Sequence, residues 1–330
     1  MADSNSQVWQ RGTVHSAQEI ASGIRRIVLR PDKPHAVRPG EHIDVRVPID
    51  GTSSVRSYSV VDASPDGSEL AISVFLSPAS RGGSAFMHQL EPGQVLEMTQ
   101  PLQNFPLRVG APSYVLLAGG IGITAILGMA ALLRRLGATY RLVYAARSRS
   151  AMAYASQLAE LHGEQLQLHL DDEGTSLDTR ALVHSVPVGA ELYMCGPIRL
   201  MDAVRRCWLD RGLDPTNLRY ETFGNSGWFE AEPFTVRVPR LGVEATVHSD
   251  ESMLEALERT GLDMMFDCRK GECGLCQVRI LDLNGHVDHR DVFYSDRQKE
   301  PNSKMCCCVS RAVADDARQP GPASVTIDIS

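Results

Sequence analysis

Three closely spaced cysteines are the residues of this chain best suited to redox chemistry. Cys268, Cys273 and Cys276 follow the spacing C-x4-C-x2-C, and three consecutive cysteines stand near the C-terminus. Three close thiolates with a distant fourth form the ligand spacing of a plant-type [2Fe–2S] cluster. Gly271 and Gly274 lie between the close ligands, and we expect them to let backbone N–H groups turn towards the sulfur atoms. The spacing therefore predicts an electron-transfer centre.

A structural zinc site and ordinary free thiols are the competing interpretations. Structural zinc sites usually carry two C-x2-C pairs, whereas this segment has one. The N-terminus lacks the basic start and apolar core of a secretion signal, so we expect a reducing, cytoplasmic location. Eight cysteines in such a compartment favour metal ligands or free thiols over disulfides.

The fourth ligand must come from Cys306, Cys307 or Cys308, which follow Cys276 after 29, 30 and 31 intervening residues. Neighbouring residues of an extended segment point to opposite faces, so Cys307 should not share a face with either neighbour. Periodicity leaves Cys306 and Cys308 as alternatives.

Composition indicates a multidomain protein without a nucleic-acid partner. The 330 residues suggest two or three domains, and the net charge is −7. The longest apolar run, residues 114–133, contains four glycines. It predicts a buried strand, turn and helix rather than a membrane span, so no membrane partner is expected.

Three regions with different periodicity must position these cysteines. Residues 1–107 predict an antiparallel barrel, because short alternating runs are separated by turn residues. Residues 108–226 predict an α/β parallel sheet, because strands alternate with helices. Residues 227–330 predict a hairpin, a helix, the cysteine segment and a closing edge strand at 322–330. The barrel strands are expected at 23–31, 41–49, 56–62, 70–76 and 94–101, and the helices of the second region at 123–137, 152–163, 177–186 and 199–212.

His286 and His289 in "GHVDHRD" could suggest a further metal site. They follow the cysteine loop in a segment with turn character. We interpret the segment as a solvated hairpin.

The motifs "CRKGECGLCQVRI", "HVDHRD" and "CVSRA" resemble the ferredoxin domain of phthalate dioxygenase reductase and vanillate demethylase reductases. The resemblance runs in order through nearly the whole chain. It implies an FMN-binding barrel, an NAD(P)-binding domain and a β-grasp plant-type [2Fe–2S] ferredoxin domain. In that family the cysteine directly before "VSRA" is the ligand, which favours Cys308 over Cys306.

"RSYSV" resembles the flavin-binding strand of the ferredoxin reductase superfamily. The resemblance implies that Arg56 pairs with a flavin phosphate, that Tyr58 lies against the ring, and that Ser59 acts at its reactive N5 edge. Without the resemblance, a surface arginine and a core tyrosine would explain the motif. Ser57 lies on the same strand and is also expected to bind the flavin. Its phosphate is expected at a second site, formed by Gly82, Gly83 and Ser84 of "SRGGSAF".

The loop around "SRGGSAF" is small and shows no adenine-binding extension. We therefore expect FMN rather than FAD. "NFPL" at 104–107 also resembles the family's flavin-proximal turn.

"LLAGGIGIT" places a glycine-rich turn between a strand and a helix. Gly119, Gly120 and Gly122 form G-G-x-G, not the G-x-G-x-x-G dinucleotide fingerprint. Close backbone approach to a coenzyme is still possible there, and Thr124 lies at the helix start, where a pyrophosphate is favoured. A tight helix–strand crossing is the alternative.

"CGP" resembles the superfamily's nicotinamide-positioning element. It implies that Cys195, Gly196 and Pro197 hold the coenzyme, with Cys195 beside the nicotinamide. Phe223, beyond the last strand of the region, is a candidate aromatic cover for the flavin, with a core phenylalanine as the alternative.

Coenzyme choice depends on the segment after the second strand of this region. Arg147 could hold the adenosine phosphate side. Ser148 and Arg149 stand where an acidic residue would favour an unphosphorylated 2′-hydroxyl, so the residues themselves admit NADPH. The resemblance favours NADH.

The three regions together supply the carriers of one electron path, from the coenzyme through the flavin to the cluster. A hydride carries two electrons and a [2Fe–2S] cluster accepts one, so a flavin must stand between them. By resemblance, the acceptor is a Rieske-type oxygenase acting on aromatic compounds, with Ser59 and Cys195 as the catalytic residues. The alternatives are a reductase for a cytochrome P450 or other haem protein, and a non-enzymatic redox carrier or sensor.

Overall fold

The computed structural model describes residues 7–49, 52–78, 80, 82–223, 227–315 and 321–329. The chain forms two compact units. The first comprises residues 1–196 and 203–221, and the second residues 197–202 and 222–330. Within the described ranges, no helix is both long enough and apolar enough to cross a membrane.

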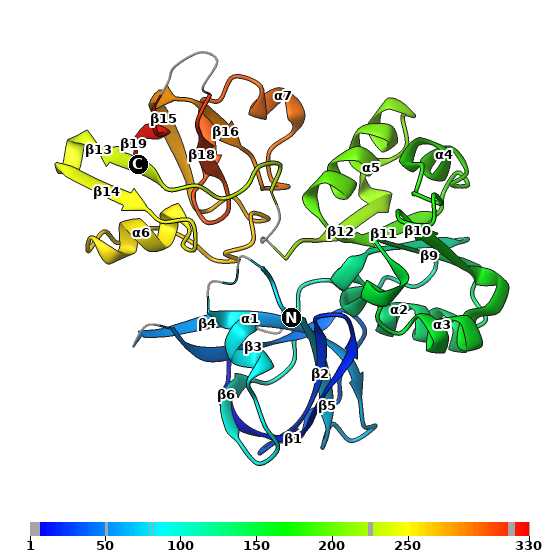
Figure 1. Ribbon diagram of the computed structural model, residues 1–330. Coiled ribbons are helices and arrows are strands. Elements are labelled where there is room, and N and C mark those ends of the chain that lie inside the picture. Colours follow the sequence, from blue (N-terminus) through cyan, green and yellow to red (C-terminus); the bar gives the residue numbers. More distant parts are fainter. Residues whose placement is uncertain are drawn as a thin grey trace. The chain divides into compact units, whose positions relative to one another are not determined.

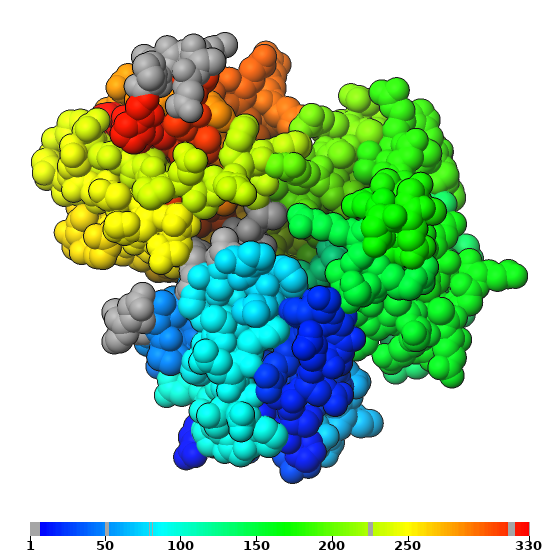
Figure 2. Space-filling model, in the orientation of Figure 1, coloured from blue at the N-terminus to red at the C-terminus, as the bar shows by residue number. Residues whose placement is uncertain are grey.

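An antiparallel barrel forms the N-terminal part of the first unit (Figure 1). The strand order is β4-β5-β2-β1-β6-β3, and a pairing between β3 and β4 closes the ring, with β7 added beside β3. Figure 2 shows β1 (blue) and the segment from α1 to β6 (cyan) side by side on its surface. The elements are β1 (Trp9–Ala21), β2 (Ile24–Pro31), β3 (Glu41–Ile49), β4 (Thr52–Ala63), β5 (Leu70–Phe75), α1 (Gly83–His88), β6 (Val95–Thr99) and β7 (Leu102–Gln103).

The predicted barrel is confirmed, but its first strand was not expected from the sequence. Only Gly12 and Val14 of β1 are buried, and a register shift follows Val14. The strand therefore lacks the alternating apolar residues that mark the other five.

A five-stranded parallel sheet forms the rest of the first unit, as predicted. Its order is β10-β9-β8-β11-β12, so the chain moves outward from β8 in one direction and then returns to β11 on its other side. Helices α2 and α3 cover one face, and α4 and α5 cover the other (Figure 1). The elements are β8 (Tyr114–Gly119), α2 (Ile123–Arg135), β9 (Tyr140–Ala146), α3 (Ala155–His162), β10 (Leu166–Leu170), α4 (Thr179–His184), β11 (Glu191–Cys195), α5 (Ile198–Asp210) and β12 (Leu218–Glu221).

Helix α3 begins later than residue 152, where the sequence placed it. A 3₁₀ turn occupies Arg149–Ala151, and Tyr154 has a left-handed backbone with φ of 64°. That conformation interrupts a helix, so α3 starts at Ala155.

The second unit is a mixed sheet of the order β14-β13-β19-β15-β17 with a separate pair, β16 and β18. The predicted edge position of the C-terminal strand is wrong. Strand β19 lies in the centre, parallel to β13 and antiparallel to β15, with Val325 and Ile327 fully buried. The elements are β13 (Phe234–Val238), β14 (Val243–Val247), α6 (Met253–Arg259), β15 (Gln277–Asn284), β16 (His286–Asp288), α7 (Asp296–Lys299), β17 (Lys304–Cys306), β18 (Arg311–Val313) and β19 (Ser324–Asp328).

The interpretation of "GHVDHRD" as a solvated hairpin is also wrong. Asp288 and Asp291 are 1% and 0% exposed, and His289 and Arg290 are buried beside them. Buried charges are tolerated when partners satisfy them, and Arg290 Nε donates to Asp288 over 2.8 Å. The segment is therefore a buried polar network inside the second unit.

Candidate functional site

The candidate flavin site of the barrel is built where β4 passes helix α1. A Cβ placed on Gly83 would lie 3.0 Å from Cγ and 3.1 Å from Nε of Arg56, so this glycine lets α1 start directly against the arginine. Gly82 has a φ of 80°, which favours glycine. Ser84 Oγ donates to Ser80 Oγ over 2.9 Å. A cation, a glycine turn and two hydroxyls thus come together, which is a donor set that fits a phosphate.

The two faces of β4 carry different groups. Alternation along the strand places Arg56 and Tyr58 on one face and Ser57 and Ser59 on the other. Burial raises the pKa of the Tyr58 phenol, with Arg56 acting in the opposite direction, so the ring is neutral. Ser59 is buried and stays a predicted contact to the flavin.

Asp44 is a positioning residue that the sequence did not single out. Asp44 lies on β3, is 5% exposed, and accepts a hydrogen bond from Ser57 Oγ of the neighbouring strand β4 over 2.5 Å. Gln7 Nε2 donates to its other oxygen over 3.0 Å. Asp44 alternates with the core residues Ile43 and Val45, so the pattern of "EHIDVRVPI" indicated the polar face of the strand and gave no signal of its burial.

The candidate coenzyme site lies at the carboxyl edge of the parallel sheet. Strand order reverses between β8 and β11, and open α/β sheets bind ligands at such a reversal. A Cβ on Gly122 would lie 2.2 Å from the carbonyl oxygen of Cys195 and 2.9 Å from the nitrogen of Gly196. The structure therefore brings the glycine turn and the "CGP" element into backbone contact. Gly119 ends β8, and a Cβ on Gly120, whose φ is 55°, would meet no atom within 4 Å, so this part of the turn is open to a ligand.

Thr124 and Arg147 occupy different parts of this edge. Thr124 is buried, and its hydroxyl donates to the carbonyl of Ile121 over 2.9 Å, which holds the turn in shape. Arg147 follows β9 and is exposed. The neighbouring Arg149 forms a bidentate ion pair with Glu173, with both N–O distances 3.0 Å.

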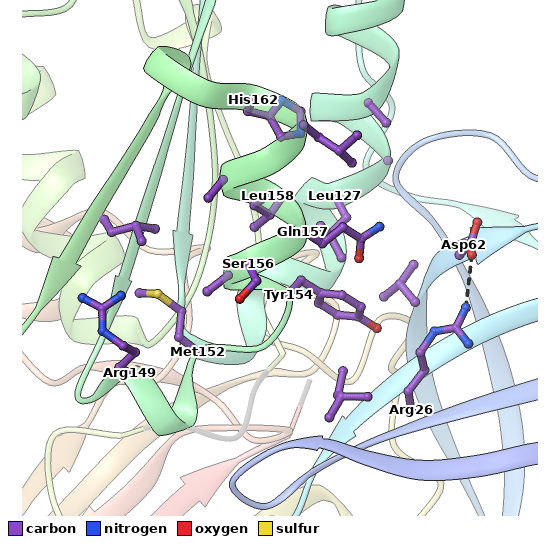
Figure 3. Close-up of a pocket in the computed structure, with 18 of the residues that line it drawn as sticks. Arg26, Asp62, Leu127, Arg149, Met152, Tyr154, Ser156, Gln157, Leu158 and His162 are labelled. Atoms are coloured by element: carbon purple, nitrogen blue, oxygen red, sulfur yellow. Dashed lines mark hydrogen bonds and ion pairs between the residues drawn. The ribbon is translucent and has the colours of Figure 1, made fainter.

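A hollow of the first unit lies between the barrel and α3 (Figure 3). The ion pair between Arg26 and Asp62 lines its barrel side, and Tyr154 lines the other. Tyr154 Oη and Ser73 Oγ of β5 are 2.5 Å apart. Arg149, from the segment that the sequence placed at the coenzyme ribose, lines this groove, whereas the predicted flavin-binding residues, the glycine turn and Cys195 do not.

Pro197 and Phe223 belong to the second unit. Phe223 is half-buried directly after β12. Its predicted role over a flavin ring stays a prediction.

The cysteine loop of the second unit carries backbone donors aimed at sulfur. The amides of Lys270, Glu272 and Cys273 each donate to Cys268 Sγ over 3.4 Å. Gly271 and Gly274 have φ values of 76° and 73°, which favour glycine and produce this turn. Such donors stabilise a thiolate and tune a bound cluster.

Two cysteine segments meet at Cys276. Its sulfur lies 3.1 Å from that of Cys308, and Cys307 Sγ donates to its carbonyl over 3.0 Å. Hydrogen bonds from Cys306, Cys307 and Cys308 lower the pKa of Cys276, as expected for one thiolate among thiols. The chain turns after Cys306, the last residue of β17, so the expected alternation along an extended segment does not apply to Cys307 and Cys308.

The donor set fits the chemistry of an iron–sulfur cluster, because it combines cysteine thiols, of which Cys276 and Cys308 are buried, with backbone amides that point at sulfur. In the described part of the chain, no group of three or more Cys, His, Asp or Glu side chains is already arranged to hold a metal ion. The four-thiolate set of Cys268, Cys273, Cys276 and Cys308 therefore stays a prediction.

Family models match each part of the chain. Residues 11–106 match an oxidoreductase FAD-binding domain, residues 100–218 the N-terminal domain of dimethylamine monooxygenase subunit DmmA-like proteins, and residues 236–313 a 2Fe-2S iron-sulfur cluster binding domain.

Similar proteins extend over nearly the whole chain. Tetrachlorobenzoquinone reductase of Sphingobium chlorophenolicum is 37% identical over 91% of this chain and 95% of its own length. Phenoxybenzoate dioxygenase subunit beta of Ectopseudomonas oleovorans is 36% identical over 90% and 92%. Heme-dependent oxidative N-demethylase beta subunit of Ectopseudomonas mendocina is 35% identical over 82% and 85%.

The solved structure of phthalate dioxygenase reductase, titled as a modular structure for electron transfer from pyridine nucleotides to [2Fe-2S], has the same fold. It aligns with a TM-score of 0.72 and 29% identity over 98% of both chains. The chain has a flavin barrel, a parallel-sheet domain and a [2Fe–2S] domain in this order, and it is an oxidoreductase. It belongs to the family of flavin- and [2Fe–2S]-containing oxygenase reductases that includes phthalate dioxygenase reductase.

Proposed function

We propose that this protein is the NADH-dependent reductase of a Rieske-type oxygenase system that acts on an aromatic compound, with FMN as its flavin. The observation that carries the proposal is the contact between Gly122 and the Cys195–Gly196 backbone at the strand-order reversal, in a chain that also holds the flavin strand and the cysteine loop. A bound flavin accepts two electrons as a hydride and releases them singly, as a [2Fe–2S] centre requires.

Each group of residues has one task in this scheme. Arg56 and the amides around Gly83 hold the flavin phosphate. Cys195 and Gly196 support the nicotinamide, and Ser59 serves the edge of the flavin that receives the hydride. Cys268, Cys273, Cys276 and Cys308 hold the cluster from which electrons leave.

FMN is favoured because the phosphate-binding turn is compact. The sequence between the end of β5 at Phe75 and the start of α1 at Gly83 is seven residues long, and its described residues form no helix or strand that could hold an adenine. Heating the purified protein and separating the released flavin tests this. FMN is expected, and release of FAD would overturn it.

NADH is favoured by the ion pair at the edge of the coenzyme site. Arg149 lies in the segment where ribose recognition is expected, and Glu173 already accepts from its Nε and from one of its terminal nitrogens. A 2′-phosphate would have to displace that carboxylate. We expect kcat/KM for NADH to exceed that for NADPH, and the reverse order would contradict the proposal.

The partner is the least constrained part of the scheme, because the relatives serve different acceptors. A dioxygenase subunit supports a Rieske partner, whereas a haem-dependent demethylase subunit supports a haem acceptor. The decisive experiment mixes the purified protein and NADH with a Rieske oxygenase and, separately, with a haem oxygenase. Rieske-centre reduction at the faster rate is expected, and faster haem reduction would replace this partner with the alternative.

A further inference from the structure

The buried carboxylate of Asp291 lies behind the cysteine loop, in the segment that the sequence had placed in solvent. It is 0% exposed, and its residue contacts the cysteine loop, the segment after Cys308 and helix α7. We propose that Asp291 is a positioning residue that fixes the two cysteine segments against each other and, by its charge, holds down the reduction potential of the cluster. This inference rests on the proposed cluster ligands.

The first contact joins Asp291 to the cysteine loop. A Cβ on Gly271 would lie 2.9 Å from Cα and 3.1 Å from Cβ of Asp291, so the two backbones pack directly together. The amide of Val292 donates to the carbonyl of Gly271 over 3.0 Å, which fixes their register. The Asp291 backbone is thus attached midway between Cys268 and Cys273.

The second contact joins it to the distant cysteine segment. Ser310 Oγ donates to Asp291 Oδ1 over 3.2 Å, and Ser310 is 1% exposed. Ser310 stands two residues after Cys308 and its amide donates to Cys306 over 3.0 Å, within the same turn. One carboxylate therefore links both segments that supply the predicted ligands.

The carboxylate is held ionised by its remaining partners. The Tyr294 amide donates to Oδ2 over 2.9 Å, His289 Nδ1 lies 3.4 Å from Oδ1, and Lys299 Nζ lies 3.9 Å from Oδ2. Burial raises the pKa of Asp291, but these hydrogen bonds and the lysine charge outweigh it, so the net shift is downward. A buried negative charge opposes the addition of an electron nearby, which lowers the potential of a neighbouring redox centre.

Asp291→Asn keeps the shape of the side chain and removes its charge. Asp288→Asn is the matched control, because Asp288 is equally buried in the same segment but accepts from Trp228, Phe229 and Arg290 instead. Holoprotein of each variant is titrated with a redox mediator and followed by EPR, and iron release to a chelator is timed separately.

For Asp291→Asn we expect the equilibrium constant for one-electron reduction to rise on the order of tenfold, which corresponds to about 59 mV towards positive potential. We also expect iron release on the order of tenfold faster than in the wild type. Asp288→Asn should show a clearly smaller effect on both. Equal effects in the two variants, or none in Asp291→Asn, would overturn the inference.

Ser310→Ala provides a second route if Asp291→Asn does not fold. It removes the link to the Cys308 segment and leaves the charge of Asp291 in place. Faster iron release with an unchanged potential is expected, and wild-type release would refute the positioning role. A wild-type protein without a [2Fe–2S] signal would instead refute the proposed function itself.

Discussion

At the scale of single residues, the surroundings of each sulfur atom separate the three candidates for the fourth ligand. Hydrogen bonding to Cys276 and burial raise the pKa of Cys308, and the charges of both Cys276 and Cys268 act on it. The charges of Asp291, Cys276 and Cys308 act on Cys306, whereas Cys308 Sγ lies 3.1 Å from Cys276 Sγ. Cys308 therefore faces the other predicted ligands from both ends of the loop.

Cys308→Ser is expected to abolish the [2Fe–2S] EPR signal, because the fourth position would lose its thiolate. Cys306→Ser, the control in the adjacent strand, should retain it, since that thiol packs beside the site. Anaerobic reduction followed by low-temperature EPR gives the measurement. A normal signal in Cys308→Ser with a lost signal in Cys306→Ser would transfer the role to Cys306.

Gly122 permits the backbone contact on which the coenzyme site depends. Gly122→Ala would drive a methyl group into the carbonyl of Cys195, because the added Cβ would lie 2.2 Å from that oxygen. Displacing this edge by roughly 1 Å should slow flavin reduction by NADH by on the order of 100-fold. Stopped-flow bleaching of the flavin measures the rate.

The control for this change is Gly137→Ala, which follows α2 at a site where a Cβ would meet nothing within 4 Å. It should reduce stability, because its φ is 63°, without slowing hydride transfer. Wild-type flavin reduction in Gly122→Ala would contradict the placement of the coenzyme at this edge.

At the scale of elements, strong periodicity made most of the fold predictable. Runs such as 70–76 and 114–119 have the alternating or continuous apolar pattern of strands and were assigned correctly. The centre position of β19 was missed because alternation shows that a strand is half-buried, not which strands flank it. The buried "HRD" segment was missed because charged residues indicate solvent unless their partners are known, and Asp291 finds its partners in α7 and after Cys308.

The contact between α3 and the barrel is an element-scale feature that the sequence did not reveal. Tyr154→Phe removes the hydroxyl that reaches Ser73 of β5 and should lower the free energy of unfolding by about 1 kcal/mol. It should also slow NADH-dependent flavin reduction, because this contact holds the nucleotide-binding sheet against the barrel. Denaturant unfolding and stopped-flow reduction measure the two effects.

Tyr140→Phe is the matched control for that prediction. Tyr140 Oη is also 2.5 Å from its partner, His162 Nδ1, but both residues lie within the nucleotide-binding part. A similar loss of stability with unchanged flavin reduction is expected. Equal slowing in both variants would show that general destabilisation, not the contact with the barrel, is responsible.

At the scale of the whole molecule, the order of the three parts determines which reactions should survive when one is disabled. The flavin strand and the coenzyme edge lie in the first unit, and all four predicted cluster ligands lie in the second. Hydride acceptance therefore depends mainly on residues of the first unit, with Pro197 and Phe223 as predicted contributions of the second, and it does not require the cysteines. Delivery to a one-electron protein partner does require them.

Removing the iron with a chelator should therefore leave NADH-dependent reduction of ferricyanide nearly intact while abolishing electron delivery to the oxygenase. Ferricyanide is small and can take electrons at the flavin, whereas a protein acceptor requires the cluster. Parallel assays of one preparation before and after iron removal measure both reactions, and reconstitution with iron and sulfide should restore delivery. Flavin-depleted protein is the control and should lose both activities. Oxygenase reduction at the untreated rate by iron-free protein would show that electrons leave from the flavin directly, and the predicted path through the cysteines would then be wrong.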